Sequence, residues 1–457
     1  MSEQFKDQGG AATMDPSALL RWVTSKVMTY VISPKRLAKN RIKVEKQRQA
    51  NNQRHTVEYF HQVDDGYSHL AAQALAALTE RYDIDLQCHL VDGPAGANAP
   101  EPELLVNLSR YDASKIAPHY KLDFPENLDA PTVTLLKLAR SILANLNNQD
   151  FVAHAASVGH ALWSGSEVAL QELGKVHGFS SLEEEKAKYE NGNTRRDSLK
   201  HYSGAMFYYG GEWYWGIDRL YHLEQRLADL GADRLPDTSV IMPKQEVKAG
   251  RLRDNGSLTL EVFASVRSPY TAMIFDRALE LAKTTGVTLQ VRPILPMVMR
   301  GVSATREKGI YIFSDAAREA RASNVPFGQF YDPIGEPSRR CFSLYPWACT
   351  QGKGNELLSS FLSAAFAEGV NTNKEDGLRY VVEKAGLEWA SAKQVVGQNG
   401  WQDTLEENRL AMYESGLWGA PSFRLLDRNN KVVLALWGQD RLWLIAKEID
   451  RLLGEYV

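Results

Sequence analysis

Ser268 and Pro269 occupy a position where a chain can assist chemistry. They follow an apolar, strand-like run, residues 260–264, and begin an apolar series at helical spacing. Helix capping alone explains both, because serine is a favoured N-cap and proline a favoured first helical residue. A chemical interpretation is that the helix start lowers the pKa of a thiol held above it, with the Ser268 hydroxyl donating its hydrogen to the sulfur. No cysteine stands in this turn, so that sulfur must arrive on a ligand.

Ala420 and Pro421 form a second candidate group, just ahead of two strand-like runs, residues 423–427 and 431–436. An X-Pro bond is cis in only about 5–6% of cases in folded proteins. By frequency alone, we expect the Ala420–Pro421 bond to be trans.

Gln439 and Asp440 form a third group, at a turn from a strand-like run into an amphipathic helix. Capping or the helix dipole explains an aspartate there. Alternatively, free N–H groups of the turn hold a ligand carboxylate while Gln439 and Asp440 hold an ammonium group. A γ-glutamyl end presents both charges.

Other chemistries find little support. The three cysteines, Cys88, Cys341 and Cys349, include no Cys-x-x-Cys pair, so a dithiol oxidoreductase would require Cys341 and Cys349 to meet. The ten histidines show no metal-ligand spacing, and we expect no metal site. The chain also lacks a phosphate-binding loop and a Gly-x-Ser-x-Gly elbow.

Composition indicates a globular protein of two domains. The chain has 457 residues, 44% of them hydrophobic and 24% charged. A net charge of −3 gives no global field that favours nucleic acid. We find no bilayer-length apolar run and no secretory signal, so we expect a cytoplasmic protein.

An internal repeat defines the domains. Residues 56–91 align without gaps with residues 259–294, and the identical pairs include Glu58/Glu261 and Tyr67/Tyr270. Each segment has the pattern of a βαβ unit. Residues 215–220 match residues 437–442 in the same way, and helix-patterned segments lie between the landmarks. We therefore expect two α/β domains of the same fold, each with an α-helical insertion between a βαβ and a ββα unit.

The predicted organisation has four parts. Residues 1–54 form a helical, basic arm, residues 55–235 the first domain, residues 236–256 a linker and residues 257–457 the second domain. In the arm, residues 19–31 have an apolar helical pattern, Pro34 ends or kinks that helix, and basic residues dominate thereafter. For residues 35–54 we favour a solvated helical arm whose apolar edge packs on the first domain. The alternative is a reversible anchor on an anionic membrane or on a protein surface.

The candidate groups, in this order, resemble the landmark motifs of the glutathione-dependent 2-hydroxychromene-2-carboxylate isomerase and kappa-class glutathione transferase family. The matching segments are 268–270, 419–421 and 437–442, together with 308–311 followed by Asp315 and Arg318. The resemblance covers nearly the whole chain and implies that both domains are thioredoxin-like. In that fold a cis-proline at Pro421 turns a backbone edge outward, so that Ala420 pairs with a peptide ligand as an added strand does.

The resemblance also implies a site in the second domain. Ser268 would hold the sulfur of bound glutathione, whose thiolate adds to a small conjugated or aromatic electrophile in the isomerases and attacks one in the transferases. The implied glutathione-binding residues are Tyr270, Lys308, Ala420, Pro421, Gln439 and Asp440.

Departures from the family pattern separate the two copies. The first copy has Asp65 and Gly66 in place of serine and proline, and its segment 204–207 contains no proline. Because an aspartate there would repel a thiolate, we interpret the first copy as a structural partner in an intramolecular pseudo-dimer. In the second copy, segment 299–308 is shortened. The competing hypothesis is a catalytically silent scaffold that binds a protein or membrane surface.

Overall fold

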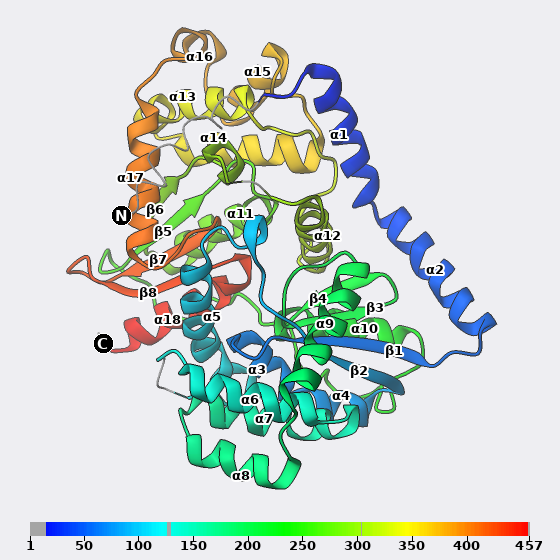
Figure 1. The fold of residues 1–457 in the computed structure, drawn as a ribbon. Helices are drawn as coiled ribbons and strands as arrows, with labels where there is room; N and C mark the ends of the chain where they lie inside the picture. Colours follow the sequence, from blue (N-terminus) through cyan, green and yellow to red (C-terminus); the bar gives the residue numbers. More distant parts are fainter. Residues whose placement is uncertain (1–14, 126–128, 303, 456–457) are drawn as a thin grey trace. The chain divides into compact units, whose positions relative to one another are not determined.

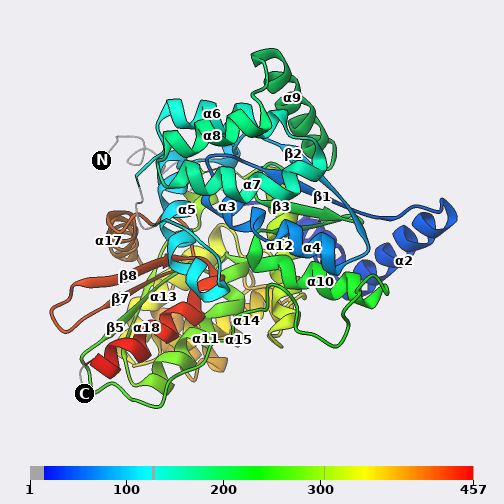
Figure 2. The same ribbon diagram turned by 90° about the horizontal axis from the view of Figure 1, so that it is seen from below.

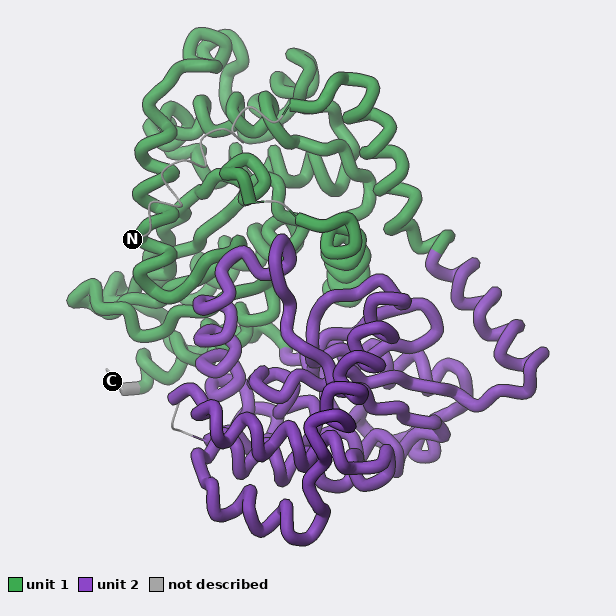
Figure 3. Tube along the Cα trace, viewed as in Figure 1, with its two compact units in different colours: residues 1–36, 246–457 green, residues 37–245 purple. Residues whose placement is uncertain are grey.

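The computed structural model describes residues 15–125, 129–302 and 304–455 (Figure 1). These residues form two compact units (Figure 3). One unit combines the N-terminal segment up to residue 36 with residues 246–457, and the other contains residues 37–245.

The unit of residues 37–245 contains a four-stranded sheet of order β2-β1-β3-β4. Its central strand pairs in parallel with β2 and antiparallel with β3. The strands are β1 (His55–His61), β2 (Ile84–Leu90), β3 (Met206–Tyr209) and β4 (Glu212–Trp215). The helices are α3 (Gly66–Ala72), α4 (Leu75–Arg81), α5 (Pro102–Ile116), α6 (Val133–Asn145), α7 (Asn148–Trp163), α8 (Glu167–His177), α9 (Leu182–Ser198) and α10 (Leu220–Asp229).

The other unit contains a second four-stranded sheet of the same form, β6-β5-β7-β8. Its strands are β5 (Thr259–Ala264), β6 (Thr288–Pro293), β7 (Ser422–Leu426) and β8 (Val432–Trp437). Its helices are α11 (Pro269–Thr285), α12 (Arg306–Ala322), α13 (Glu336–Thr350), α14 (Gly354–Ser363), α15 (Glu375–Lys384), α16 (Trp389–Val395), α17 (Trp401–Glu414) and α18 (Leu442–Glu455). The predicted α/β fold, with a helical insertion between a βαβ and a ββα unit in each copy, is confirmed.

Helices cover both faces of this second sheet. Strands β7 and β8 lie between α17 and α18 in Figure 1 and, seen from below, in Figure 2. Helix α11 contacts α18 as well as β5 and β6. Because its two faces are covered, β5 is buried from Leu260 onward, which explains its nearly continuous apolar sequence.

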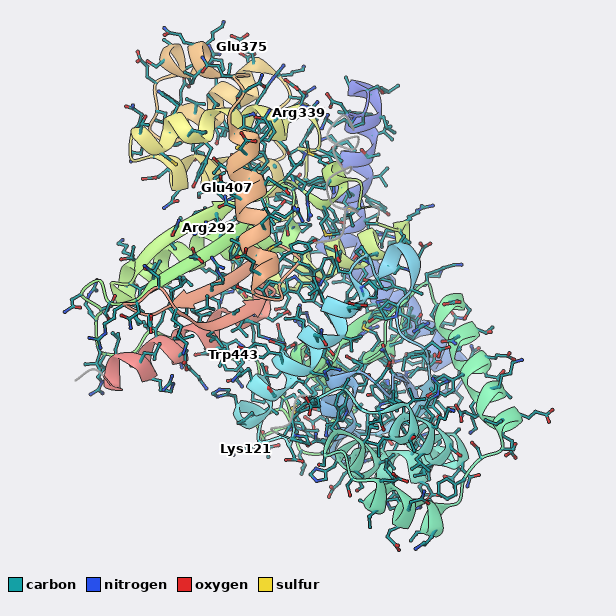
Figure 4. The ribbon with its side chains drawn as sticks, turned by 60° about the vertical axis from the view of Figure 1, so that its left-hand side comes forward. Lys121, Arg292, Arg339, Glu375, Glu407 and Trp443 are labelled. Carbon is teal, nitrogen blue, oxygen red and sulfur yellow. The ribbon has the colours of Figure 1, made fainter. Side chains whose placement is uncertain are left out.

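Buried ion pairs repeat between the two sheets. Glu58 on β1 accepts hydrogen bonds from His89 on β2 and from Arg195. Burial opposes ionisation of Glu58, but these bonds outweigh it and lower its pKa to about 2. In the second sheet Glu261 pairs with Arg292, which is labelled in Figure 4. Arg292 also donates a hydrogen bond to Asn408 on α17 at 3.2 Å. The two partners of the paired glutamates, His89 and Arg292, stand at equivalent positions, 31 residues beyond each glutamate.

The N-terminal helix α1 (Ala18–Val31) belongs to the unit of residues 246–457 and packs on it. Its Arg21 donates hydrogen bonds to the carbonyl oxygens of Asp332 (2.7 Å) and Ile334 (2.6 Å). Ser25 accepts one from the N–H of Asp332 at 3.0 Å. These polar side chains recur every fourth residue, on the face opposite the exposed apolar side chains, and satisfy backbone groups of an irregular segment.

Helix α2 (Pro34–Ala50) begins at the predicted break, with Pro34 as its first residue. Arg41 of α2 makes a two-pronged ion pair with Glu212 on β4, at 2.7 and 2.8 Å. This pair joins α2 to the first sheet within the unit of residues 37–245. No helix in the described parts of the chain has both the length and the apolar character to cross a membrane.

Candidate functional site

Ser268 is the N-cap of α11. Its oxygen accepts a hydrogen bond from the N–H of Thr271 at 3.2 Å, which confirms the capping interpretation. The same hydroxyl donates to the carbonyl oxygen of Ala420 at 3.0 Å. The start of α11 and the loop before β7, 152 residues apart in the chain, therefore meet at this side chain.

The Ala420–Pro421 peptide bond is cis. The frequency-based expectation of a trans bond was wrong, and the geometry implied by the family resemblance is confirmed. The Ala420 N–H finds no acceptor among the described residues, whereas the carbonyl of Pro421 accepts a hydrogen bond from the N–H of Gly438 at 2.9 Å. The loop thus presents a backbone edge at Ala420 and is tied at Pro421 to the turn after β8.

That turn carries Gln439 and Asp440. Gln439 is buried, and its side-chain amide donates to the Asp440 carboxylate. Helix α11 contacts this turn. The three groups that the sequence singled out, around Ser268, Ala420 and Gln439, therefore form one continuous region of the second domain.

Tyr270 lies in the first turn of α11 and contacts α12. Its hydroxyl donates to Asp315 at 2.9 Å, and Arg318 donates to the other oxygen of that carboxylate at 2.7 Å. Asp315 is 1% exposed. The pair fastens α12 to α11 beside Ser268, a partnership that the sequence motifs alone did not reveal.

Lys308 lies in the first turn of α12, and burial lowers the pKa of its amino group to about 8. The amino nitrogen is 5.8 Å from the centre of the Trp418 ring. The indole nitrogen of Trp418 is buried and has no hydrogen-bond partner in the described structure. Trp418 also packs against Trp437, with ring centres 5.6 Å apart. Sequence reasoning missed Trp418, although it stands immediately before the 419–421 motif.

The first domain repeats this framework with altered chemistry. The hydroxyl of Tyr67 donates to Asp112 at 2.8 Å, and both residues precede their counterparts Tyr270 and Asp315 by the same interval. At the position of Ser268 stands Asp65, which accepts a hydrogen bond from the N–H of Ser68 at 2.9 Å. Burial raises the pKa of Asp65 to about 6.

The loop of the first domain reaches a similar shape without proline. Ala205 occupies the place of Pro421 and has a positive φ of 52°. Its carbonyl oxygen accepts the N–H of Gly216 at 2.7 Å, as that of Pro421 accepts Gly438. Gly204, in the place of Ala420, lies against Gln62, where an added Cβ would meet the Gln62 Cβ at 2.4 Å. A larger residue at Gly204 therefore does not fit.

The cysteines do not form a dithiol. Cys341 and Cys349 both lie on α13, eight residues and therefore about 12 Å apart along the helix axis. A disulfide needs Cα atoms within about 7 Å. Burial raises the pKa of each of these two thiols. No cluster of metal-ligating side chains occurs among the residues that the structure describes.

Residues 259–450 match the DSBA-like thioredoxin domain family. This part of the chain is therefore a DSBA-like thioredoxin domain. Over 196 residues the chain is 24% identical to 2-hydroxychromene-2-carboxylate isomerase from Sphingobium xenophagum, a match that covers 40% of this chain and 94% of the isomerase.

The chain is also similar to solved structures over less than half of its length. A structure of 2-hydroxychromene-2-carboxylate isomerase shares 20% identity with a TM-score of 0.37, covering 43% of this chain and 97% of the isomerase. The cytosolic disulfide reductase DsbM from Pseudomonas aeruginosa shares 16% identity with a TM-score of 0.34, covering 43% of this chain and 98% of the reductase.

Proposed function

We propose that the second domain is a glutathione-dependent isomerase or transferase that acts on a small conjugated or aromatic electrophile. The observation that carries the proposal is the 3.0 Å contact between the Ser268 hydroxyl and the Ala420 carbonyl, beside the cis-proline. This contact places the start of a helix, a hydroxyl group and the backbone N–H of Ala420, unpaired among the described residues, next to one another. No cysteine of the chain stands in either of these two turns. Bound glutathione would supply the thiol that this point lacks.

Ser268 has the means to orient a ligand sulfur without giving up its cap. Its oxygen keeps the Thr271 N–H while its hydrogen turns from the Ala420 carbonyl toward the sulfur, because a hydroxyl hydrogen rotates about the C–O bond. The dipole of the 17-residue helix α11 favours negative charge at the same end. Both effects favour a thiolate over a thiol.

The backbone of Ala420 fits an extended peptide. Its N–H has no acceptor among the described residues. Its carbonyl oxygen becomes free to accept a hydrogen bond from the ligand when the Ser268 hydroxyl no longer donates to it. Pairing with both groups is how an added strand binds to a sheet edge. The cysteinyl residue of glutathione offers a matching donor and acceptor.

The charged ends of the tripeptide have candidate partners on either side. Lys308 would attract a carboxylate, and such an acceptor would also satisfy the buried indole N–H of Trp418. Gln439 and Asp440 would hold the ammonium group of the γ-glutamyl end. A buried donor without a partner costs about 1–3 kcal/mol, so ligand binding at Trp418 would recover part of that energy.

A titration with glutathione tests the proposal. We expect millimolar glutathione to raise the Tm of the second domain, by an amount equivalent to about 2.7 kcal/mol at a hundred times Kd. Ser268→Ala and Asp440→Ala should reduce the shift. Asp218→Ala, at the position in the first domain that matches Asp440, should leave it unchanged.

S-methylglutathione separates peptide binding from thiolate binding. Ser268→Ala should weaken the response to glutathione more than the response to S-methylglutathione, which has no thiol. A Tm that does not move with either compound would favour the silent scaffold. If the shift is seen, a screen of conjugated and aromatic electrophiles distinguishes isomerisation from conjugation.

A further inference from the structure

Helix α1 turns a mixed face inward, where Met28 and Val31 pack against the core, and a largely apolar face outward. Its inner face carries Arg21, Ser25 and Thr29, which hydrogen-bond to the backbone of residues 330–334. Its outer face carries six large apolar side chains, each between 40% and 71% exposed. They are Leu19, Leu20, Trp22, Val23, Val27 and Tyr30. We call them the α1 apolar face.

This arrangement is not the usual scatter of exposed apolar residues. Residues 19, 23, 27 and 30 follow the i, i+4, i+8, i+11 spacing that places side chains on one side of a helix. Burial of Arg21 on the opposite side fixes which side faces out, because its guanidinium is held by the carbonyls of Asp332 and Ile334. A continuous apolar face rimmed by polar residues marks an interaction surface.

Exposed lysines lie on α1 and on the helix that follows it in the chain. Lys26 is exposed on α1, and Lys35, Lys39, Lys43 and Lys46 are exposed on α2, at a spacing that puts the α2 lysines on one side of that helix. Among the described residues none of these five lysines has an ion-pair partner. By contrast, the arginines of α2 that lie between them are engaged. Arg41 pairs with Glu212 and Arg48 with Glu45.

We propose that α1 lies on the surface of an anionic membrane, with its apolar face in the headgroup region and with Lys26 and Lys35, which belong to the same unit, against the lipid charges. Trp22 and Tyr30 are aromatic residues of the kind that favours the membrane–water interface. A basic segment beside an exposed apolar helix is the composition that binds anionic lipid reversibly. Binding would be peripheral.

Charge argues against a second copy of the chain as the occupant. A symmetric dimer through this face would place the same surface of both copies together, so Lys26 and its neighbours would face like charges. An anionic lipid surface instead brings opposite charge to Lys26 and Lys35. The proposal is independent of glutathione binding, because it involves neither Ser268 nor the loop at Pro421.

Vesicle co-sedimentation of the full chain tests the proposal. We expect binding to phosphatidylcholine vesicles that contain phosphatidylserine, much weaker binding to pure phosphatidylcholine, and loss of binding at high salt. Replacing Trp22 and Val27 together by serine should lower the affinity at least about tenfold. Lys26→Gln and Lys35→Gln combined should lower it about twenty-five-fold, since each lysine contributes about a factor of five.

Matched variants control for nonspecific effects. Val168 and Val176 on α8 are 74% and 76% exposed, and replacing both by serine should leave vesicle binding unchanged. All of these positions are exposed, so the Tm of each variant should stay close to that of the parent. Equal binding by the parent and the Trp22/Val27 variant would overturn the proposal. So would dimerisation without lipid binding, if sedimentation velocity shows that Trp22→Ser disperses the dimer.

Discussion

Lys308 is a buried cation at neutral pH. Burial lowers the pKa of its amino group to about 8, against an ordinary value of 10.5. At pH 7 the group is still mostly protonated, so the folded domain bears the cost of burying a charge. An anionic ligand beside Lys308 would reduce that cost, which is the usual situation of a binding residue in a ligand-free site.

We predict that Lys308→Met stabilises the ligand-free protein and weakens the glutathione response. The folded-state pKa lies below the unfolded one, so the cost is fully present below about pH 8 and disappears as the pH rises toward about 10.5. At pH 7 the gain should be about 1–3 kcal/mol. Thermal unfolding between pH 7 and pH 10 measures the difference, which should shrink as the pH rises.

Lys186→Met, an exposed position on α9, serves as the control and should show neither effect. If Lys308→Met instead lowers the Tm at pH 7, the Lys308 amine makes stabilising contacts in the free protein and is not held ready for a ligand.

Burial also disfavours the charged form of Asp65, but because this group is an acid its pKa is raised. Its pKa is raised to about 6 because the side chain is withdrawn from solvent at the start of α3. At neutral pH the group is mostly ionised and occupies the position that Ser268 has in the second domain. A carboxylate there repels a thiolate, so the residue type alone separates the two copies chemically.

At the scale of elements, the first helix of each βαβ unit is the clearest difference between the copies. In the second domain α11 runs unbroken for 17 residues. In the first domain the equivalent segment is divided into α3 and α4, of seven residues each. A longer helix presents a stronger dipole at its start, which favours the second copy as the one that binds an anion.

In both copies, a tyrosine–aspartate hydrogen bond nevertheless links this first helix to the helical insertion. We predict that Tyr270→Phe and Tyr67→Phe each destabilise their own domain by about 1–3 kcal/mol, because each removes a donor from a buried carboxylate. Only Tyr270→Phe should also reduce the Tm shift caused by glutathione, since it lies beside Ser268. Calorimetry with and without glutathione measures both effects.

Tyr67→Phe is the matched control, because it breaks an equivalent bond in the other copy. Equal loss of the glutathione response in both variants would show that the response follows global stability and not the geometry of the site.

At the scale of the whole molecule, the chain is not divided in simple sequence order. Helix α1, at the N-terminal end of the described chain, belongs to the unit formed by residues 246–457. Figure 1 shows it alongside the helical insertion of that unit, and α1 contacts α12. The hydrogen bond from Arg21 to Ile334 spans 313 residues of sequence. Part of the stability of the second domain therefore comes from a segment that precedes the first.

We predict that Arg21→Ala destabilises the unit containing residues 246–457 by about 3–5 kcal/mol and leaves the unit of residues 37–245 unaffected. The substitution deprives two carbonyl groups of their donor and breaks the ion pair with Asp15. Hydrogen exchange should become faster in residues 330–344 and unchanged in β1 to β4.

Lys26→Ala is the control on the same helix, because its side chain is exposed. Faster exchange throughout residues 37–245 in the Arg21 variant would mean that the two units unfold together.

The sequence by itself determined the elements and their order. The repeat, the strand–helix–strand patterns and the serine cap of α11 depend on local periodicity and backbone preference, which are visible in a single chain. The candidate residues Ser268, Ala420 and Gln439 were also found from local pattern and resemblance.

Only the tertiary structure decided how those elements are joined. The cis bond at Pro421 runs against its local frequency and is set by the surrounding fold. The partner of Tyr270, the neighbour of Lys308 and the buried face of α1 all involve residues far away in sequence. The buried face of α1 includes Arg21, because the groups that Arg21 satisfies are backbone carbonyls, which every residue carries and no sequence pattern distinguishes.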